Sequence, residues 1–170
     1  MLGLKRGSVK LYPYQKQWSD EFEKERRRLL NKLGNLAIDV QHIGSTSVPG
    51  LTAKPILDIA IGVQRFKDAQ KLAKSLRELG YNFDRPFQHQ LFFARGPDAK
   101  RTHYVHVMRY NGAKWKNDAL FREYLRSHPA RARAYATLKV KLAKQYAGER
   151  QKYSDGKNAF IKETLRLARR

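Results

Sequence analysis

The sequence predicts a single α+β domain, in which a small mixed sheet carries flanking helices and a C-terminal helical layer. Apolar residues form short alternating or continuous segments between residues 36 and 109, which is typical of strands. After Asn111-Gly112 the apolar residues recur at helical spacing. The chain has 170 residues, enough for one hydrophobic core. We therefore expect one domain over residues 1–170, with the sheet in about 9–112 and the helices in 113–170.

The first half contains an extended segment, a helix and two strands. Residues 9–12 are extended and end at Pro13. A helix is expected over about residues 19–33, because acidic residues precede basic ones and Gly34 follows. Strands are expected over residues 36–43, which alternate and then break at Gly44, and over residues 56–63.

The second half continues with a helix, three strands and then helices only. Residues 67–79 place Ala and Leu at helical spacing, and Gly80 suits a C-cap. Residues 81–83, 90–94 and 102–109 are predicted strands, with turns at residues 84–86 and 96–99. Helices are expected over residues 117–127, 129–147 and 154–168.

The stretch from His42 to Asp58 carries the clearest functional pattern. A strand ends at Gly44 and turns into Ser45 and Thr46, hydroxyl residues that can cap a short helix. The start of a helix leaves backbone N–H groups unpaired, so a phosphate placed there meets ready donors. The following strand puts Asp58 on one face, beside the small side chains at positions 60 and 62, and its apolar residues on the other.

The spacing of this stretch excludes two common phosphate loops. A P-loop has lysine directly after its second glycine, whereas here Gly44 and Gly50 precede Lys54. A dinucleotide fingerprint is also absent from the sequence. A Gly-Ser turn, then twelve residues, then Asp58-Ile-Ala-Ile resembles the nucleotidyltransferase superfamily, with its polymerase-β-like fold. That superfamily normally has a second acidic residue where this chain has Ala60.

Four segments together resemble the GrpB-like family: HIGSTSVPGLTAKPILDIAIGV at residues 42–63, RTHYVHV at 101–107, FREYLRSHP at 121–129 and YSDGKNAFI at 153–161. The resemblance covers about residues 9–161. It implies a nucleotidyltransferase-like fold for the chain. Members of the family stand alone or are fused behind dephospho-coenzyme A kinase, and they have no firmly assigned reaction.

Five residues are candidates for binding phosphate. Gly44, Ser45 and Thr46 form the turn that we expect to hold a phosphate group. Lys54 and Arg101 are natural phosphate partners, since each stands just before a segment that carries a candidate catalytic residue. Either cation can instead be a surface residue, or it can form a salt bridge with Asp58.

Asp58 and His106 are the candidate catalytic residues. Nucleotidyl transfer needs a divalent metal, commonly Mg²⁺, which is usually held by two or three carboxylates. This chain offers one, and the candidate for the superfamily's later acidic position is His106. With His42 and His103, these two residues form a candidate site that suits Mn²⁺ or Zn²⁺ better than Mg²⁺. One histidine can alternatively act as a general base for an acceptor hydroxyl.

Alternatives remain open for two of the histidines. His42 shares its strand face with apolar residues, which favours a hydrogen-bonded histidine of the core over a ligand. A regular strand places His103 and His106 on opposite faces, and only a bulge or bend would bring both to one site. We therefore weight His106 above His103.

Composition bounds the partners and the compartment. The chain has 36 Lys and Arg against 15 Asp and Glu, a net charge of +21. Such a charge favours polyanions. The expected partners are a nucleoside triphosphate or another phosphorylated small molecule, and RNA or another polyanion, although a solvated basic surface explains the charge equally well. The sequence has no cysteine, which excludes disulfides and thiolate metal sites. Without a long apolar run, we expect a cytoplasmic protein with no membrane association.

The sequence leaves three functional hypotheses. The first is a nucleotidyltransferase-like enzyme that binds a nucleoside triphosphate and a divalent metal and transfers a nucleotidyl group to an unknown acceptor. The second is a non-catalytic module that binds a nucleotide, a coenzyme A-related ligand or RNA, and Ala60 is the residue that favours it. The third is a metal-dependent phosphate-ester hydrolase that uses the histidines.

Overall fold

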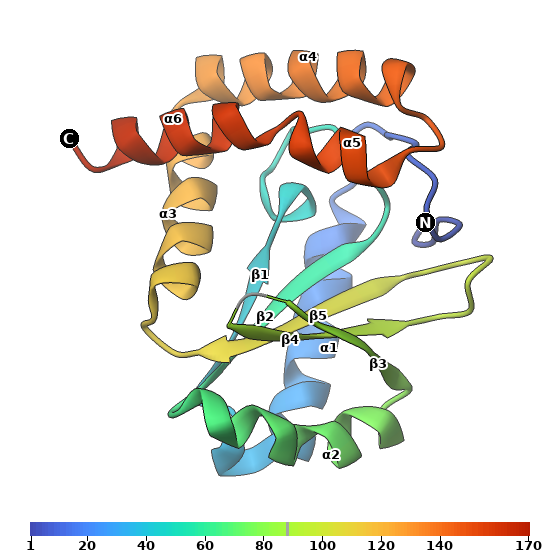
Figure 1. Cartoon of the computed structure of the whole chain (residues 1–170), viewed down its shortest axis with the longest axis vertical. Helices are drawn as coiled ribbons and strands as arrows, with labels where there is room; N and C mark the ends of the chain where they lie inside the picture. Colours follow the sequence, from blue (N-terminus) through green and yellow to red (C-terminus); the bar gives the residue numbers. More distant parts are fainter. Residues whose placement is uncertain (88) are drawn as a thin grey trace.

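The structure is a computed structural model that describes residues 1–87 and 89–170. A five-stranded mixed sheet in the order β1-β2-β5-β4-β3 lies below a layer of C-terminal helices (Figure 1). Its strands are β1 (Asp39–Ile43), β2 (Leu57–Val63), β3 (Tyr81–Phe87), β4 (Gln90–Arg95) and β5 (His103–Arg109). The central strands β2 and β5 are parallel, and the other neighbouring pairs are antiparallel. The predicted α+β class is confirmed.

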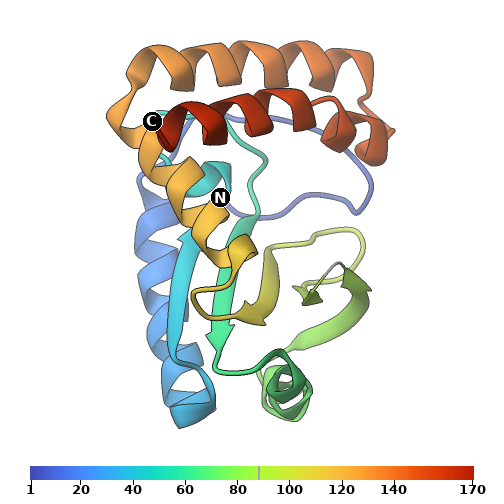
Figure 2. The same ribbon diagram turned by 60° about the vertical axis from the view of Figure 1, so that its left-hand side comes forward.

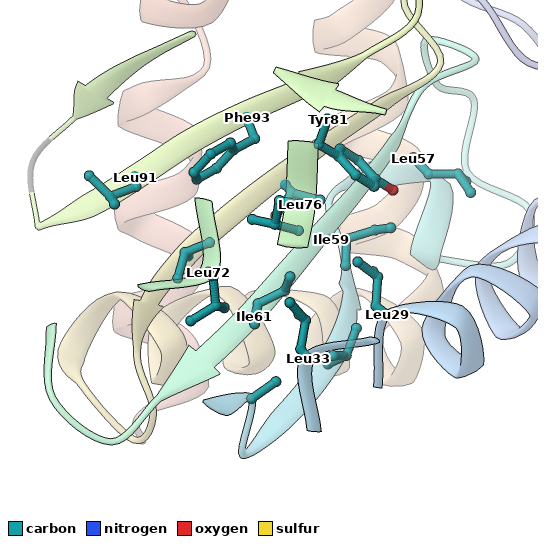
Figure 3. Packing of buried hydrophobic residues seen from close by; sticks show 14 of the residues in the cluster. Leu29, Leu33, Leu57, Ile59, Ile61, Leu72, Leu76, Tyr81, Leu91 and Phe93 are labelled. Atoms are coloured by element: carbon teal, nitrogen blue, oxygen red, sulfur yellow. The ribbon is translucent and has the colours of Figure 1, made fainter. Parts of the chain in front are cut away.

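One face of the sheet is covered by helices from the first half of the chain. These helices are α1 (Gln17–Leu33), η3 (Phe66–Leu72) and α2 (Ala73–Glu78). Figure 3 shows Leu29 and Leu33 of α1 packed against Ile59 and Ile61 of β2. Burying this apolar surface against the alternating face of β2 stabilises the fold, at about 25 cal/mol per Å² removed from water.

The opposite face lies toward the helices of the second half. These are α3 (Ala113–Ser127), α4 (Pro129–Gln145), α5 (Arg150–Asp155) and α6 (Asn158–Ala168). Figure 2 shows α4 and α6 side by side above the ends of the strands, with α3 descending beside β1 and β2. Pro129 occupies the first turn of α4, where its missing N–H costs nothing. Within the described residues, no helix is long and apolar enough to cross a membrane.

Several predicted boundaries are shifted in the structure. The first strand begins at Asp39, because η1 (Gly34–Leu36) follows α1 directly. The predicted turn at residues 84–86 is wrong, since β3 continues to Phe87 past an irregularity between Phe83 and Arg85. The predicted final helix is divided into α5 and α6. The long predicted segment at residues 67–79 is also divided, into η3 and α2.

Candidate functional site

Asp58 lies on the face of β2 that points away from the hydrophobic core. Its Cα partner on β1 is Ile43, and its partner on β5 is Tyr104. Two positions further along, Ala60 is paired with His106, which places the imidazole beside the carboxylate. His106 Nε2 is 3.5 Å from Asp58 Oδ1, and the Asp58 side chain is 32% exposed. The sheet therefore presents a carboxylate and an imidazole together on one face.

The turn after β1 approaches Asp58 closely. Gly44 has φ +69°, and a Cβ atom at this position would lie 2.6 Å from Asp58 Oδ2. Glycine is required there for two reasons, because the backbone conformation disfavours a side chain and the carboxylate occupies the space. The helix that follows, η2 (Ser45–Ser47), has three residues, and no side-chain hydrogen bond caps it. The predicted turn is confirmed, but this helix is too short to hold a phosphate by its N-terminus alone.

The turn and Asp58 line a cavity of about 210 Å³ at the junction of the sheet and the helical layer. The turn after β1, the strands β2 and β5 and the loop before β2 contribute one side of the cavity. Helices α4 and α5, with Lys157 just before α6, contribute the other side. The lining residues are Gly44, Ser45, Thr46, Ala53, Lys54, Ile56, Asp58, Tyr104, Tyr135, Arg150, Tyr153, Ser154 and Lys157.

Three cationic side chains line this cavity, and a fourth, Lys139, contacts one of its lining residues. Lys139 of α4 is 1% exposed, and its ammonium group donates to Ser45 Oγ at 3.0 Å and to the carbonyl oxygen of Thr52. Arg150 donates to the hydroxyl oxygen of Tyr104 at 3.0 Å. Lys54 and Lys157 lie over the ring of Tyr153, at 5.6 and 4.5 Å from its centroid. We refer to Lys54, Lys139, Arg150 and Lys157 as the cation cluster.

The amines of the cation cluster are poised to change protonation near neutral pH. Burial first, and then the charges of Arg150 and Lys157, lower the pKa of Lys54 to about 7. Burial and the charges of Lys157 and Lys54 lower the pKa of Lys139 to about 7. Burial likewise lowers the pKa of Lys157 to about 8, although Asp58 opposes this shift. A bound anion would favour the charged form of each amine.

Two members of the cation cluster, Lys54 and Arg150, also affect the pKa of Asp58. Burial by itself raises the pKa of Asp58, but the hydrogen bond and charge of His106, with the charges of Lys54 and Arg150, bring it below its ordinary value. Asp58 is therefore ionised at neutral pH. Among the described residues that line the cavity it is the single carboxylate, so the cavity has an excess of positive charge.

The structure brings most of the predicted phosphate residues together. Gly44, Ser45, Thr46 and Lys54 line the cavity. Arg101 does not, because it donates to the carbonyl oxygen of Gly96 at 2.7 Å and pairs with Asp98 at 2.5 Å in the β4–β5 connection. The alternatives in which Arg101 or Lys54 forms a direct salt bridge with Asp58 are not observed among the described residues; the nearest partner of Asp58 is His106.

His42 and His103 lie on the opposite face of the sheet from Asp58. His42 pairs with Ile59, stacks on Phe22 with ring centroids 4.6 Å apart, and shares a 2.9 Å hydrogen bond with Thr46. Burial lowers its pKa to about 3. The structure thus supports the alternative of a core histidine at this position.

His103 belongs to a polar network on that opposite face. It pairs with Leu57 and lies 3.0 Å from Arg95, which in turn pairs with the buried carboxylate of Glu25. Burial lowers the pKa of His103 to about 4. The predicted four-residue metal site is therefore not assembled. No group of three or more His, Cys, Asp or Glu side chains within residues 1–87 and 89–170 is placed to hold a metal ion.

Sequence reasoning missed Lys139, Arg150 and Lys157 as residues of the site. The signal for Lys139 was its spacing, because Tyr135, Lys139 and Leu142 share the buried stripe of α4. A lysine on such a stripe requires buried partners, which here are Ser45 and Thr52. Nothing local to Arg150 or Lys157 indicates that they converge on a turn about one hundred residues earlier.

Several cations of the C-terminal helices are committed to contacts within the protein. Arg122 donates to the carbonyl oxygen of His42 at 2.7 Å, and Arg126 donates to that of Ser47 at the same distance. Arg131 bonds to Thr164 at 2.9 Å. These residues join the helices to the turn and to one another, so they are not a free basic surface.

Comparison with known proteins agrees with the fold and with the resemblance in the sequence. A family model described as GrpB protein matches residues 8–167. The chain is 35% identical to the glutamate-rich protein GrpB of Alkalihalophilus pseudofirmus, over 97% of this chain and 98% of that protein. It is also 28% identical to a dephospho-CoA kinase of Mycobacterium leprae, over 89% of this chain but 44% of the kinase.

Solved structures show the same relationship. The crystal structure of the conserved protein GrpB from Enterococcus faecalis has a TM-score of 0.84 and 35% identity, covering 94% of this chain and 96% of that one. Cid1 poly(U) polymerase, solved with MgATP, has a TM-score of 0.54 and 14% identity, covering 78% of this chain and 44% of that one. The chain therefore has a nucleotidyltransferase-like fold, and the likeness to Cid1 shows the fold alone.

Proposed function

The chain belongs to the GrpB family, and from this premise we propose that it binds a nucleoside triphosphate whose phosphate groups lie within the cation cluster. One observation carries the proposal. Lys54, Arg150 and Lys157 line a small cavity in which, among the described residues, Asp58 is the single carboxylate, and Lys139 donates to Ser45 of the same lining. Charged hydrogen bonds to phosphate are among the strongest polar contacts in proteins. A polyphosphate supplies the negative charge that this cavity lacks.

The donor set at this cavity does not fit a metal site built by the protein. Mg²⁺ requires hard oxygen ligands, and Mn²⁺ or Zn²⁺ would take Asp58 and His106 as two ligands. His42 and His103 cannot complete the set, because they lie on the other face of the sheet. The nearby ammonium and guanidinium groups would repel a divalent cation. We propose that the cation cluster neutralises the phosphates in place of a metal.

Nucleotidyl transfer is a second candidate function, favoured by the position of His106. Its Nδ1 lies 3.1 Å from the side-chain oxygen of Gln90, and its Nε2 faces Asp58. In the tautomer whose Nδ1–H donates to Gln90, the Nε2 lone pair can accept a proton from an acceptor hydroxyl, and the imidazolium that forms then donates from Nε2 to Asp58. Ala60 argues against this candidate, because the second acidic residue of the superfamily is missing there.

The competing ligands are a coenzyme A-related molecule and RNA. Both carry phosphate, and the dephospho-CoA kinase relative gives the first some support. RNA binding through the exposed surface would weaken steeply with salt and would be insensitive to Asp58→Asn. Affinity for a ligand bound in the cavity would fall strongly when residues of the cation cluster are substituted.

Isothermal titration tests the proposal. Inorganic tripolyphosphate and ATP would be titrated with and without EDTA into the wild type, Lys157→Gln and the matched control Lys141→Gln on the outer face of α4. We expect saturable binding that survives EDTA, falls about tenfold or more in Lys157→Gln and is unchanged in the control. Binding that is abolished by EDTA, or that falls equally in both variants, would contradict the proposal.

A further inference from the structure

A second cavity adjoins the phosphate cavity on its α3 and α6 side. It measures about 250 Å³ and shares Gly44, Ser45, Asp58 and Tyr135 with the phosphate cavity. The two spaces therefore meet at the carboxylate. We call this second cavity the α3–α6 slot. A ligand whose phosphates lie in the cation cluster can extend past Asp58 into it.

The walls of the slot are largely apolar, although it opens beside charged residues. Ile43 of β1, Phe121 of α3, and Ile161 and Leu165 of α6 line it. Phe121, Ile161 and Leu165 keep part of their surface exposed within this folded layer. Phe121 is fixed by an edge-to-face contact with Tyr135, with ring centroids 5.3 Å apart. Such a slot suits a flat, mainly apolar group.

One edge of the slot is polar, and all of its polar groups come from the first turns of α3. Lys114, Asn117 and Asp118 line this edge. Lys114 is paired with Asp118, and the Asn117 side-chain oxygen accepts from Arg169 at 2.7 Å. Together they offer donors and acceptors in one row. An alkyl chain cannot form hydrogen bonds with such an edge, whereas a nucleobase presents donors and acceptors along its own edge.

We propose that the α3–α6 slot binds the nucleobase of the ligand, with the sugar lying over Asp58 and His106. This inference rests on the proposed function, because it assigns the phosphates to the cation cluster. It specifies nucleotides as the ligand class, and they should bind more tightly than simple polyphosphates or prenyl diphosphates. The apolar walls provide affinity for the flat base, and the α3 edge provides the hydrogen bonds that orient it.

The test compares ligands that share phosphates but differ in the attached group. Tripolyphosphate, the four common nucleoside triphosphates and geranyl diphosphate would be titrated into the wild type, Leu165→Trp and Asn117→Leu. Leu165→Trp fills the slot, and Leu167→Trp is its control, since Leu167 lies on the same helix but does not line the slot. Asn117→Leu removes one polar group of this edge, at a helical position with a partly exposed side chain.

We expect at least one nucleoside triphosphate to bind at least about tenfold more tightly than tripolyphosphate, a difference of about 1.4 kcal/mol in binding free energy. Leu165→Trp should remove this advantage without changing the affinity for tripolyphosphate, and Asn117→Leu should reduce it. Equal binding of tripolyphosphate and every nucleotide would overturn the inference and leave the phosphate site intact. Preference for geranyl diphosphate would also overturn it. If tripolyphosphate itself does not bind, the proposed function fails as well.

Discussion

Ala60 and His106 are Cα partners across the parallel strands β2 and β5, on the same face as Asp58. The resemblance to nucleotidyltransferases implies a second acidic residue at position 60. The side chain there is instead the methyl group of Ala60, and the imidazole of His106 lies opposite it on β5. With no second carboxylate on this part of β2, the charged groups that lower the pKa of Asp58 are His106 first, and then Lys54 and Arg150 of the cation cluster. The site therefore combines the turn and one carboxylate with an excess of positive charge among its lining residues.

Asp58→Asn should strengthen metal-free binding of tripolyphosphate several-fold at about pH 6, where the lysines are protonated, because it removes a negative charge next to the phosphates. Titration calorimetry in EDTA would measure the change. Asp20→Asn on the exposed side of α1 is the control for net charge. A metal-dependent affinity that disappears in Asp58→Asn would favour the nucleotidyltransferase mechanism instead.

Gly44→Ala should destabilise the protein more than Gly50→Ala does. Both glycines have positive φ, +69° and +76°, but only the first would place its Cβ against Asp58, and nothing lies within 4 Å of the second. We expect about 1 kcal/mol for the backbone conformation at either position and about 1–3 kcal/mol more at position 44. Urea unfolding would give both free energies. Equal losses would show that the carboxylate moves aside freely.

Lys139→Met should weaken tripolyphosphate binding while leaving stability unchanged or raising it by about 1 kcal/mol. Burial disfavours the charged amine, and this penalty offsets the hydrogen bonds to Ser45 and Thr52. Chemical denaturation at about pH 6, where the amine is charged, measures the stability. A loss of more than about 3 kcal/mol would show that the hydrogen bonds outweigh the burial of charge.

The stability of the unliganded protein should rise with pH above neutrality. The folded pKa values of Lys54 and Lys139 are about 7, below the ordinary value of 10.5, so the unfolded chain binds more protons over this interval. The loss of stability that comes from burying the two charged amines is largest below pH 7. It decreases at higher pH, as the amines of the folded protein lose their protons. Unfolding free energies from about pH 6 to about pH 10 should show this rise, which should be smaller in Lys139→Met.

ATP binding should be coupled to uptake of protons. At about pH 8 the phosphates are fully ionised, so protons taken up on binding report the amines of the cation cluster. Calorimetry in buffers of different ionisation enthalpy would measure the uptake, and affinity should fall as pH rises toward about 9. Binding without proton uptake would place the phosphates away from these lysines.

Local patterns in the sequence determined the sheet and one part of the site. Alternation along β2 separated Asp58 from the core residues Ile59 and Ile61, and the structure confirms both faces. The same period of two correctly divided His103 from His106, because successive side chains of a strand point to opposite faces. The break at Gly44 correctly located the turn that meets the carboxylate.

Only the tertiary structure decided which charges surround that carboxylate. Lys139 meets Ser45 across 94 positions of the chain, and Arg150 meets Tyr104 across 46. Periodicity in the sequence indicates on which side of a helix or strand a residue lies. It does not indicate which other helix or strand that side will pack against. The packing of the C-terminal helices over the strand ends brings only a few of the many lysines and arginines to the cavity. This packing depends on contacts between segments far apart in the chain, which no local pattern specifies.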